Sequence, residues 1–167
     1  LEAQEDVFYY VTVMNENYVH PELPAGAEEG IRRGMYRLRE GGSGQGRRVQ
    51  LLGSGAILRE VLAAAEALER EHGVAADVWS VTSWTELRWD GLAASGASPA
   101  VREARGGVAG RSWVAQCLGA TAGPIVAASD YVSAVAAGAN PALIRQAAWS
   151  DCGKPMVSVG HGGGPPA

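Results

Sequence analysis

A strand, a glycine turn, a helix and a second strand follow one another over residues 47–84, and this order constrains the fold more than any other feature. The first strand is predicted over 47–55, where the apolar run of RRVQLLGSG stops at its glycines. A helix is predicted over 56–73, and a second strand over 76–84 (ADVWSVTSW). Such a unit joins parallel strands through a right-handed crossover. The predicted buried face of the helix consists of Ile57, Val61, Ala64, Ala65 and Leu68.

Further elements are predicted on both sides of this unit. An apolar strand is expected over 7–14, and a short amphipathic helix over 26–39, which Gly41-Gly42 would end. A third core strand is expected over 123–130, with a helix after it over 131–137, and a fourth short strand over 154–160. Three or four parallel strands with intervening helices predict an α/β fold of helix, sheet and helix layers.

The 23 glycines and 8 prolines are unevenly distributed. Gly, Ser, Ala and Arg dominate residues 40–47, 93–110 and 160–167, which are therefore expected to be loops or poorly ordered chain.

Charge and cysteine content exclude several function classes. The 14 Lys and Arg against 18 Asp and Glu give a net charge of -4, and basic residues occur at most in pairs such as Arg32-Arg33, so no nucleic acid or membrane partner is expected. Cys117 and Cys152 lie far apart without metal-ligand spacing, which favours free thiols in a reducing cytoplasm over a zinc site. Without a signal peptide or an apolar run of about 20 residues, a soluble intracellular protein is expected.

Three groups of residues are candidates for a functional role. Gly53-Ser54-Gly55 lies between a strand and a helix, where backbone N–H groups can bind an anion, but a tight structural turn is the favoured interpretation. Glu16 and His20 lie in a polar loop after a strand; an active-site role is possible there, and an exposed or interface loop is favoured. His72 precedes Gly73, where an imidazolium would complement the helix dipole.

Two of the five tryptophans have predicted places. Trp79 is expected to pack in the core on the same strand face as Val81, and Trp89, between Arg88 and Asp90, at an edge or a subunit interface. No nucleophile–base pair, metal cluster or carboxylate pair emerges from the spacing. The residues alone therefore predict a fold and no chemistry.

Two long strings resemble the C-terminal part of the homodimeric-type pyruvate dehydrogenase (acetyl-transferring) component. They are FYYVTVMNENYVHPELPAGAEEGIRRGMYRLRE and VQLLGSGAILREVLAAAEALEREHGVAADVWSVTSWTELRWDG, and WVAQCLGATAGPIVAASDYVSAV continues the match. The resemblance covers about 6–91 and 111–135. The chain departs from the family at LAASGASPAVREARGGVAG, and at SVGHGGGPPA, where the family has a Gly-Thr-Asp-Gly-Phe-Gly-Arg signature.

The resemblance implies a division into two domains, and it implies the activity of a full-length enzyme, called the parent here, of which this chain would be a C-terminal fragment. Residues 1–25 would be the last strand of a thiamine-binding domain and a connection, and 26–167 a transketolase-type C-terminal domain, truncated or diverged after about 136. The parent would use thiamine diphosphate and magnesium to decarboxylate pyruvate, then reductively acetylate the lipoyl group of a dihydrolipoyl acetyltransferase core in the cytoplasm.

This part of the parent would be structural and would support a homodimer. The family's catalytic, cofactor and metal residues lie upstream of Leu1, so none is assigned to this chain and no cofactor is expected to bind it alone. The alternative is a stand-alone, non-catalytic interaction or regulatory module that retains the fold. The order in 93–110 and 136–167 is left open, as is the role of Glu16 and His20.

Overall fold

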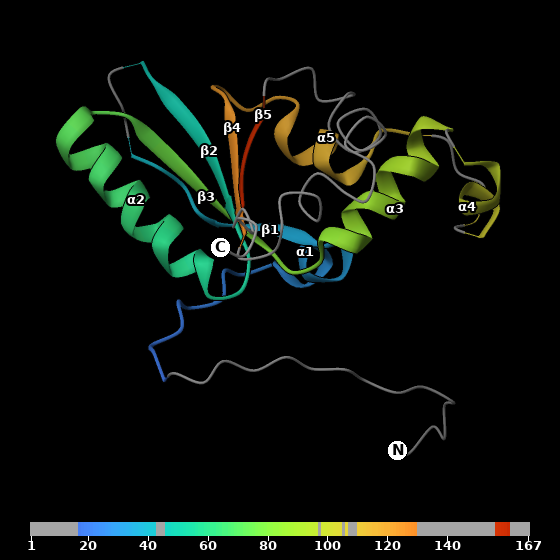
Figure 1. Cartoon of the computed structure of the whole chain (residues 1–167), viewed down its shortest axis with the longest axis horizontal. Coiled ribbons are helices and arrows are strands. Elements are labelled where there is room, and N and C mark those ends of the chain that lie inside the picture. Colours follow the sequence, from blue (N-terminus) through green and yellow to red (C-terminus); the bar gives the residue numbers. More distant parts are fainter. Residues whose placement is uncertain are drawn as a thin grey trace, which may run out of the picture.

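The protein is a five-stranded α/β sheet with helices on both faces, as the computed structural model in Figure 1 shows. The structure describes residues 17–42, 46–96, 98–104, 106 and 110–129, and the backbone of 156–160. The strand order is β1-β3-β2-β4-β5; β1 is antiparallel to β3, and all other neighbours are parallel. The strands are β1 (Met35–Arg39), β2 (Arg48–Gly53), β3 (Ala75–Val81), β4 (Ile125–Ser129) and β5 (Met156–Gly160).

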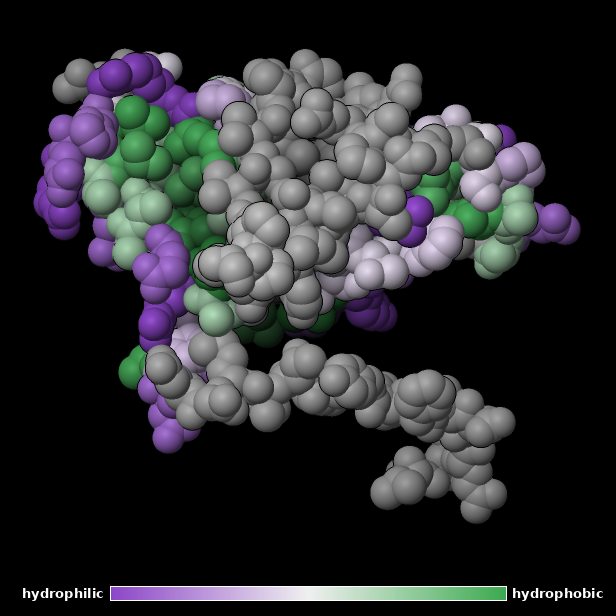
Figure 2. Space-filling model, in the orientation of Figure 1, coloured by the Kyte–Doolittle hydropathy of each residue, from purple (hydrophilic) through white to green (hydrophobic). Residues whose placement is uncertain are grey.

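The helices form a layer on each face of the sheet. They are α1 (Glu28–Arg33), α2 (Ile57–His72), α3 (Trp84–Ser95), α4 (Pro99–Ala104) and α5 (Trp113–Leu118). Helix α2 covers one face, where Val61 and Ala65 pack on Val49, Leu51 and Val78. Residues of α3 and α5 cover the other face, and the outer surface of α2 is hydrophilic (Figure 2). The predicted three-layer α/β fold with a mostly parallel sheet is confirmed.

The central crossover forms as the sequence predicts, except that Ala64, expected on the buried face of the helix, is exposed. β2 and β3 are parallel over their whole lengths, from Arg48 opposite Ala75 to Gly53 opposite Ser80. The helix between them ends at Gly73, whose positive φ of 60° suits a residue without a side chain. Strands β4 and β5 also lie within their predicted ranges.

The predicted helix over 26–39 is wrong in its second half. Helix α1 ends at Arg33, because Gly34 adopts a left-handed conformation with φ of 100°. Residues Met35–Arg39 then form β1, which places Met35 in the core beneath α5 and lets Leu38 pack on the opposite face. The spacing of Met35 and Leu38 fits one face of a helix, but in the strand the two residues lie on opposite faces, and both faces are buried. As a strand, Met35–Arg39 pairs with β3 and satisfies the backbone N–H and C=O groups on that side of β3. A helix in its place would leave those groups of β3 without partners.

The predicted strand over 76–84 and the predicted loop over 93–110 are also partly wrong. β3 ends at Val81, since the Ser83 hydroxyl accepts a hydrogen bond from the Glu86 amide at 3.1 Å and so begins α3. That helix continues to Ser95, and α4 follows with Pro99 as its first residue, a position where proline's missing N–H costs nothing.

The strand predicted over 7–14 and the helix predicted over 131–137 lie outside the described residues. Within the described part of the chain, no helix has the length and apolar character that a bilayer crossing requires.

Candidate functional site

A buried carboxylate organises the amino end of the two central parallel strands. Asp77 on β3 is 3% exposed, and its Oδ1 accepts a hydrogen bond from the Gly41 backbone N–H at 2.8 Å and pairs with the Arg48 guanidinium. Its Oδ2 accepts a hydrogen bond from Gln50 Nε2 at 2.7 Å. Three donors therefore compensate the charge that burial would otherwise penalise.

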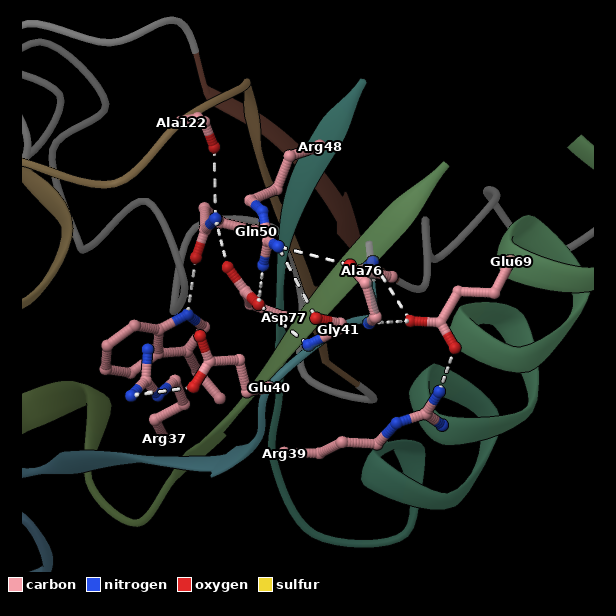
Figure 3. A network of polar contacts seen from close by, with 12 residues as sticks. Arg37, Arg39, Glu40, Gly41, Arg48, Gln50, Glu69, Ala76, Asp77 and Ala122 are labelled. Atoms are coloured by element: carbon pink, nitrogen blue, oxygen red, sulfur yellow. Dashed lines mark hydrogen bonds and ion pairs between the residues drawn. The ribbon is translucent and has the colours of Figure 1, made fainter. Parts of the chain in front are cut away.

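Gln50 extends this network into the core (Figure 3). Its side chain is fully buried; Nε2 also donates to the Ala122 carbonyl at 3.0 Å, and Oε1 accepts from Trp79 Nε1 at 2.8 Å. The pairing of β2 with β3 sets Gln50 directly opposite Asp77. The network thus connects the loop before β4 with a core indole, and each of its polar groups has a partner.

A second carboxylate attaches the end of β1 to α2. Glu69 on α2 accepts hydrogen bonds from the Gly42 and Ala76 backbone N–H groups at 3.1 and 3.4 Å, and pairs with Arg39. Gly41 lies so close to Ala76 that an added Cβ would meet its backbone nitrogen at 2.5 Å. The two networks together hold the chain leaving β1 against the sheet (Figure 3).

The glycine turn at the carboxyl end of β2 is a close-packed structural element. A Cβ on Gly53 would lie 2.9 Å from the Val61 side chain, so glycine is needed for α2 to approach the strand. The buried Ser54 hydroxyl accepts a hydrogen bond from Trp84 Nε1 at 3.0 Å, which connects the turn to α3. The interpretation as a tight turn agrees with this packing.

A hollow of about 420 Å³ lies beside β1. We call it the β1 hollow; it lies between the segment Pro24–Gly30, β1 and α5, with the rings of Trp79 and Trp113 among its lining. Cys117 also lines it, and burial raises the pKa of this thiol to about 12, an effect that the Arg33 charge only partly offsets. A thiol of this kind stays protonated at neutral pH and is a poor nucleophile.

A second hollow, of about 280 Å³, lies between α3 and α5. Arg33 from α1 reaches into this region, where it pairs with Asp90 at 3.5 Å and lies over the Trp113 ring at 4.2 Å. Arg111 donates to the Ala115 carbonyl at 2.9 Å. Its arginines are thus engaged within the fold, and they join α1, α3 and α5.

The sequence-predicted candidates do not converge on one place. His20 is exposed and stacks near Tyr18 with ring centroids 4.4 Å apart, while Glu16 lies outside the described residues, as does Cys152. His72 occupies the last turn of α2, and its predicted effect on the helix dipole stays a prediction. Among the described residues, no three His, Cys, Asp or Glu side chains are grouped closely enough to hold a metal ion.

The structure confirms the predicted place of Trp79 but does not test that of Trp89. Trp79 is 6% exposed and packs in the core with Val81, which confirms that prediction. Trp89 is half-buried with the Arg88 guanidinium 5.2 Å from its ring, and its predicted role at an interface stays a prediction.

Sequence reasoning missed the Asp77 and Gln50 network altogether. Each residue interrupts an otherwise apolar strand, and a polar side chain at such a position requires a buried partner. The two polar residues within apolar strands could therefore have predicted a buried polar network. The arrangement holds the chain that leaves β1 against the sheet and offers a hollow beside that strand.

Known proteins resemble this chain over most of its length. Residues 34–147 match the model of the transketolase-like TK C-terminal domain. The chain is 52% identical over 132 residues to a pyruvate dehydrogenase E1 component of Pseudomonas aeruginosa, and 46% identical over 151 residues to one of Cupriavidus necator. These matches cover 79% and 86% of this chain.

The relatives are much longer than the matched segment. The two matches span 15% and 16% of those proteins, and a match to the Escherichia coli (strain K12) pyruvate dehydrogenase E1 component, 59% identical over 92 residues, covers 54% of this chain and 10% of that protein.

Proposed function

Because the chain belongs to the family of transketolase-like TK C-terminal domains, we propose that it serves as this domain of a pyruvate dehydrogenase E1 component. The similarity to proteins of that name, at 52% and 46% identity over most of the chain, carries the proposal. The whole protein would decarboxylate pyruvate and reductively acetylate the lipoyl group of dihydrolipoyl acetyltransferase. We place this activity in the cytoplasm.

The parent reaction would use thiamine diphosphate, which acts as an electron sink for the decarboxylation, together with magnesium. The described residues do not fit a site for either group. Their acidic and thiol side chains are not grouped as metal ligands, and the buried Asp77 carboxylate is already bound by three donors. We therefore assign no step of the reaction to these residues, and no cofactor to this chain alone.

The role of this domain in the parent would be structural. Residues 1–25 would belong to the preceding thiamine-binding domain and its connection, and residues from 26 onward to the C-terminal domain, which completes the subunit, supports the homodimer and forms one wall of the approach to the active site. The rigid attachment of β1 to the sheet by Asp77 and Glu69 supports such a role.

Substrate choice by the full-length gene product tests this proposal. Purified protein with thiamine diphosphate and magnesium is offered pyruvate, 2-oxoglutarate or a branched 2-oxoacid, and acetylation or acylation of a lipoyl domain is followed by mass spectrometry. We expect acetylation from pyruvate to dominate. A protein that prefers another 2-oxoacid, or a gene with no thiamine-binding Gly-Asp-Gly motif upstream of the Leu1 codon, would contradict it; the second result would favour the stand-alone module.

A further inference from the structure

Large apolar side chains are exposed along residues 17–31, a stretch that we call the corner. Among the described residues, those most exposed are Val19 at 95%, Leu23 at 51% and Ile31 at 37%. Single exposed apolar residues are ordinary on protein surfaces, but these three belong to one short stretch that leads into and through α1 (Figure 1). Residues 17–31 thus present apolar surface that the described part of the domain does not bury.

This corner is firmly built from α1 onward. The Ile31 carbonyl accepts a hydrogen bond from Thr82 Oγ1 at 2.8 Å, and Arg33 pairs with Asp90 on α3. Gly30 is buried, and an added Cβ would lie 2.6 Å from that of Tyr36. These contacts therefore hold α1 in place against the rest of the domain.

The adjoining strand β1 has one open edge. The Gly34 carbonyl accepts hydrogen bonds from the Thr82 and Ser83 N–H groups and so faces β3, whereas the Met35 carbonyl faces away and accepts from Trp113 Nε1 at 2.9 Å. Backbone direction alternates along an antiparallel strand, so the N–H and C=O of Arg37 also face away from β3. No described segment forms a hydrogen bond with them.

The β1 hollow lies along this open edge. Its lining combines the aromatic rings of Trp79 and Trp113 with the charged groups Glu29, Arg37 and Glu40. An extended peptide has the complementary groups: a backbone to pair with Arg37 and an apolar side chain to enter the hollow. Pro24–Ala27 forms one wall of the same hollow, so the surface is continuous with the chain that enters the domain.

We propose that the corner formed by residues 17–31, the open edge of β1 and the β1 hollow is the docking surface for an extended segment of the same polypeptide, from the part that precedes this domain. The proposal rests on the proposed function. The relatives match this chain over 15% and 16% of their length, which leaves ample chain to supply the segment, and the connection through Pro24–Ala27 holds that part of the polypeptide next to the hollow.

Hydrogen exchange in the full-length protein tests the pairing directly. Overlapping peptides from mass spectrometry isolate the Arg37 amide, for which the described residues supply no hydrogen-bond partner. We expect it to exchange at least about tenfold more slowly than an unstructured amide, because strand addition protects it. Exchange at the unstructured rate in the intact protein would overturn the proposal.

Two matched double variants test the apolar corner. Val19→Glu with Leu23→Glu places charges in the proposed contact, and Ala63→Glu with Ala64→Glu places the same charges on the exposed face of α2. We expect the first to raise Arg37 amide exchange and proteolytic cleavage of 17–26 by about tenfold and the second to change neither, with protection of β2 intact in both. Equal behaviour of the two variants would overturn the proposal.

Dilution separates the proposed occupant from a second copy of the chain. Protection of the Arg37 amide by the same polypeptide is independent of protein concentration, and loss of that protection when the oligomer dissociates would overturn our assignment. The outcome is separate from the proposed function, because turnover of pyruvate by the wild-type protein does not depend on where this segment docks.

Discussion

Asp77 is the residue on which the polar interior of this domain depends. Its carboxylate is nearly fully buried and receives hydrogen bonds or ion pairing from the Gly41 amide after β1 and from Gln50 and Arg48, which both lie on β2. A carboxylate with this many donors fixes their relative positions as well as compensating its own charge. The end of β1 is therefore tied to β2 and β3 through one side chain.

Asp77→Ala is expected to destabilise the domain strongly. The change leaves the buried donors of Gly41 and Gln50 and the Arg48 charge without their acceptor, which lowers the free energy of unfolding by about 2 to 4 kcal/mol. Urea denaturation followed by circular dichroism measures it. Glu71→Ala is the control, since Glu71 is exposed and pairs with its neighbour Arg70 on the surface, and it should cost at most about 0.5 kcal/mol. Equal losses in the two variants would contradict the role given to Asp77.

Cys117 is expected to react slowly with alkylating reagents. Burial raises its pKa from 9.0 to about 12, so at pH 8 far less of it is thiolate than in an unfolded chain. In a Cys152→Ser background, iodoacetamide should modify the folded protein about a hundredfold more slowly than the urea-unfolded protein. Similar rates in the two states would show that the thiol is accessible and ionised normally.

The same thiol gives stability a defined pH dependence. Below about pH 9 the thiol is protonated in both folded and unfolded states and has no effect. Between about pH 9 and 12 the unfolded chain releases the proton while the folded domain keeps it, so this contribution to stability falls as the pH rises. Cys117→Ser, measured by urea denaturation over this range, should lessen the decline.

At the scale of elements, Gly34 decides where α1 ends and β1 begins. Its φ of 100° turns the chain out of the helix, and it lies against α3, where an added Cβ would be 2.8 Å from the Ser83 carbonyl oxygen and 3.0 Å from Leu87. Both a left-handed backbone and close packing therefore require glycine here. This residue separates the observed helix and strand from the single helix that spacing predicted.

Gly34→Ala tests that role against a matched glycine. Gly26 also has a positive φ, of 77°, but an added Cβ there meets nothing within 4 Å. Gly26→Ala should cost about 1 kcal/mol of unfolding free energy for the backbone alone, and Gly34→Ala about 1 to 3 kcal/mol more because Ser83 and Leu87 must move. Thermal denaturation compares the two. Equal effects would show that packing at Gly34 contributes nothing.

The central crossover was predictable from sequence because one pattern specifies it at every level. The apolar strand, the glycine turn and the amphipathic helix ending at Gly73 agree with one another, and the structure contains them with small changes at their ends. The start of α3 carries a comparable signal that went unused: Ser83 and Glu86 have the spacing of a capping box. This spacing predicts that a helix begins after Ser83, and therefore that the preceding strand ends before it.

The site was less predictable for a physical reason. Gln50 and Asp77 signal an internal polar partner by interrupting apolar strands, but their pairing depends on the register of β2 against β3, which tertiary packing sets. Local periodicity favoured a helix over the Met35–Arg39 strand, because Met35 and Leu38 are three residues apart; in the strand they lie on opposite faces, both of which are buried. Glu16, Cys152 and the strand predicted over 7–14 lie outside the described residues, and those expectations stay predictions.

At the scale of the whole molecule, the described residues form a sheet covered by helices, and we propose a docking surface along its edge strand β1. Polar networks fix the chain leaving β1, while the corner at residues 17–31 and the β1 hollow remain open to contact. Among the described residues, no three His, Cys, Asp or Glu side chains are grouped as metal ligands. Our proposal assigns the reaction to other parts of a larger protein, which this domain would complete.

Release of carbon dioxide from pyruvate tests this account most directly. The isolated 167-residue chain and the full-length gene product are assayed side by side with thiamine diphosphate and magnesium at equal molar concentration. The account predicts thiamine-dependent release by the full-length protein and none above the protein-free rate by the isolated chain. Turnover by the isolated chain, or an inactive full-length protein that is correctly folded and loaded with cofactor, would contradict it.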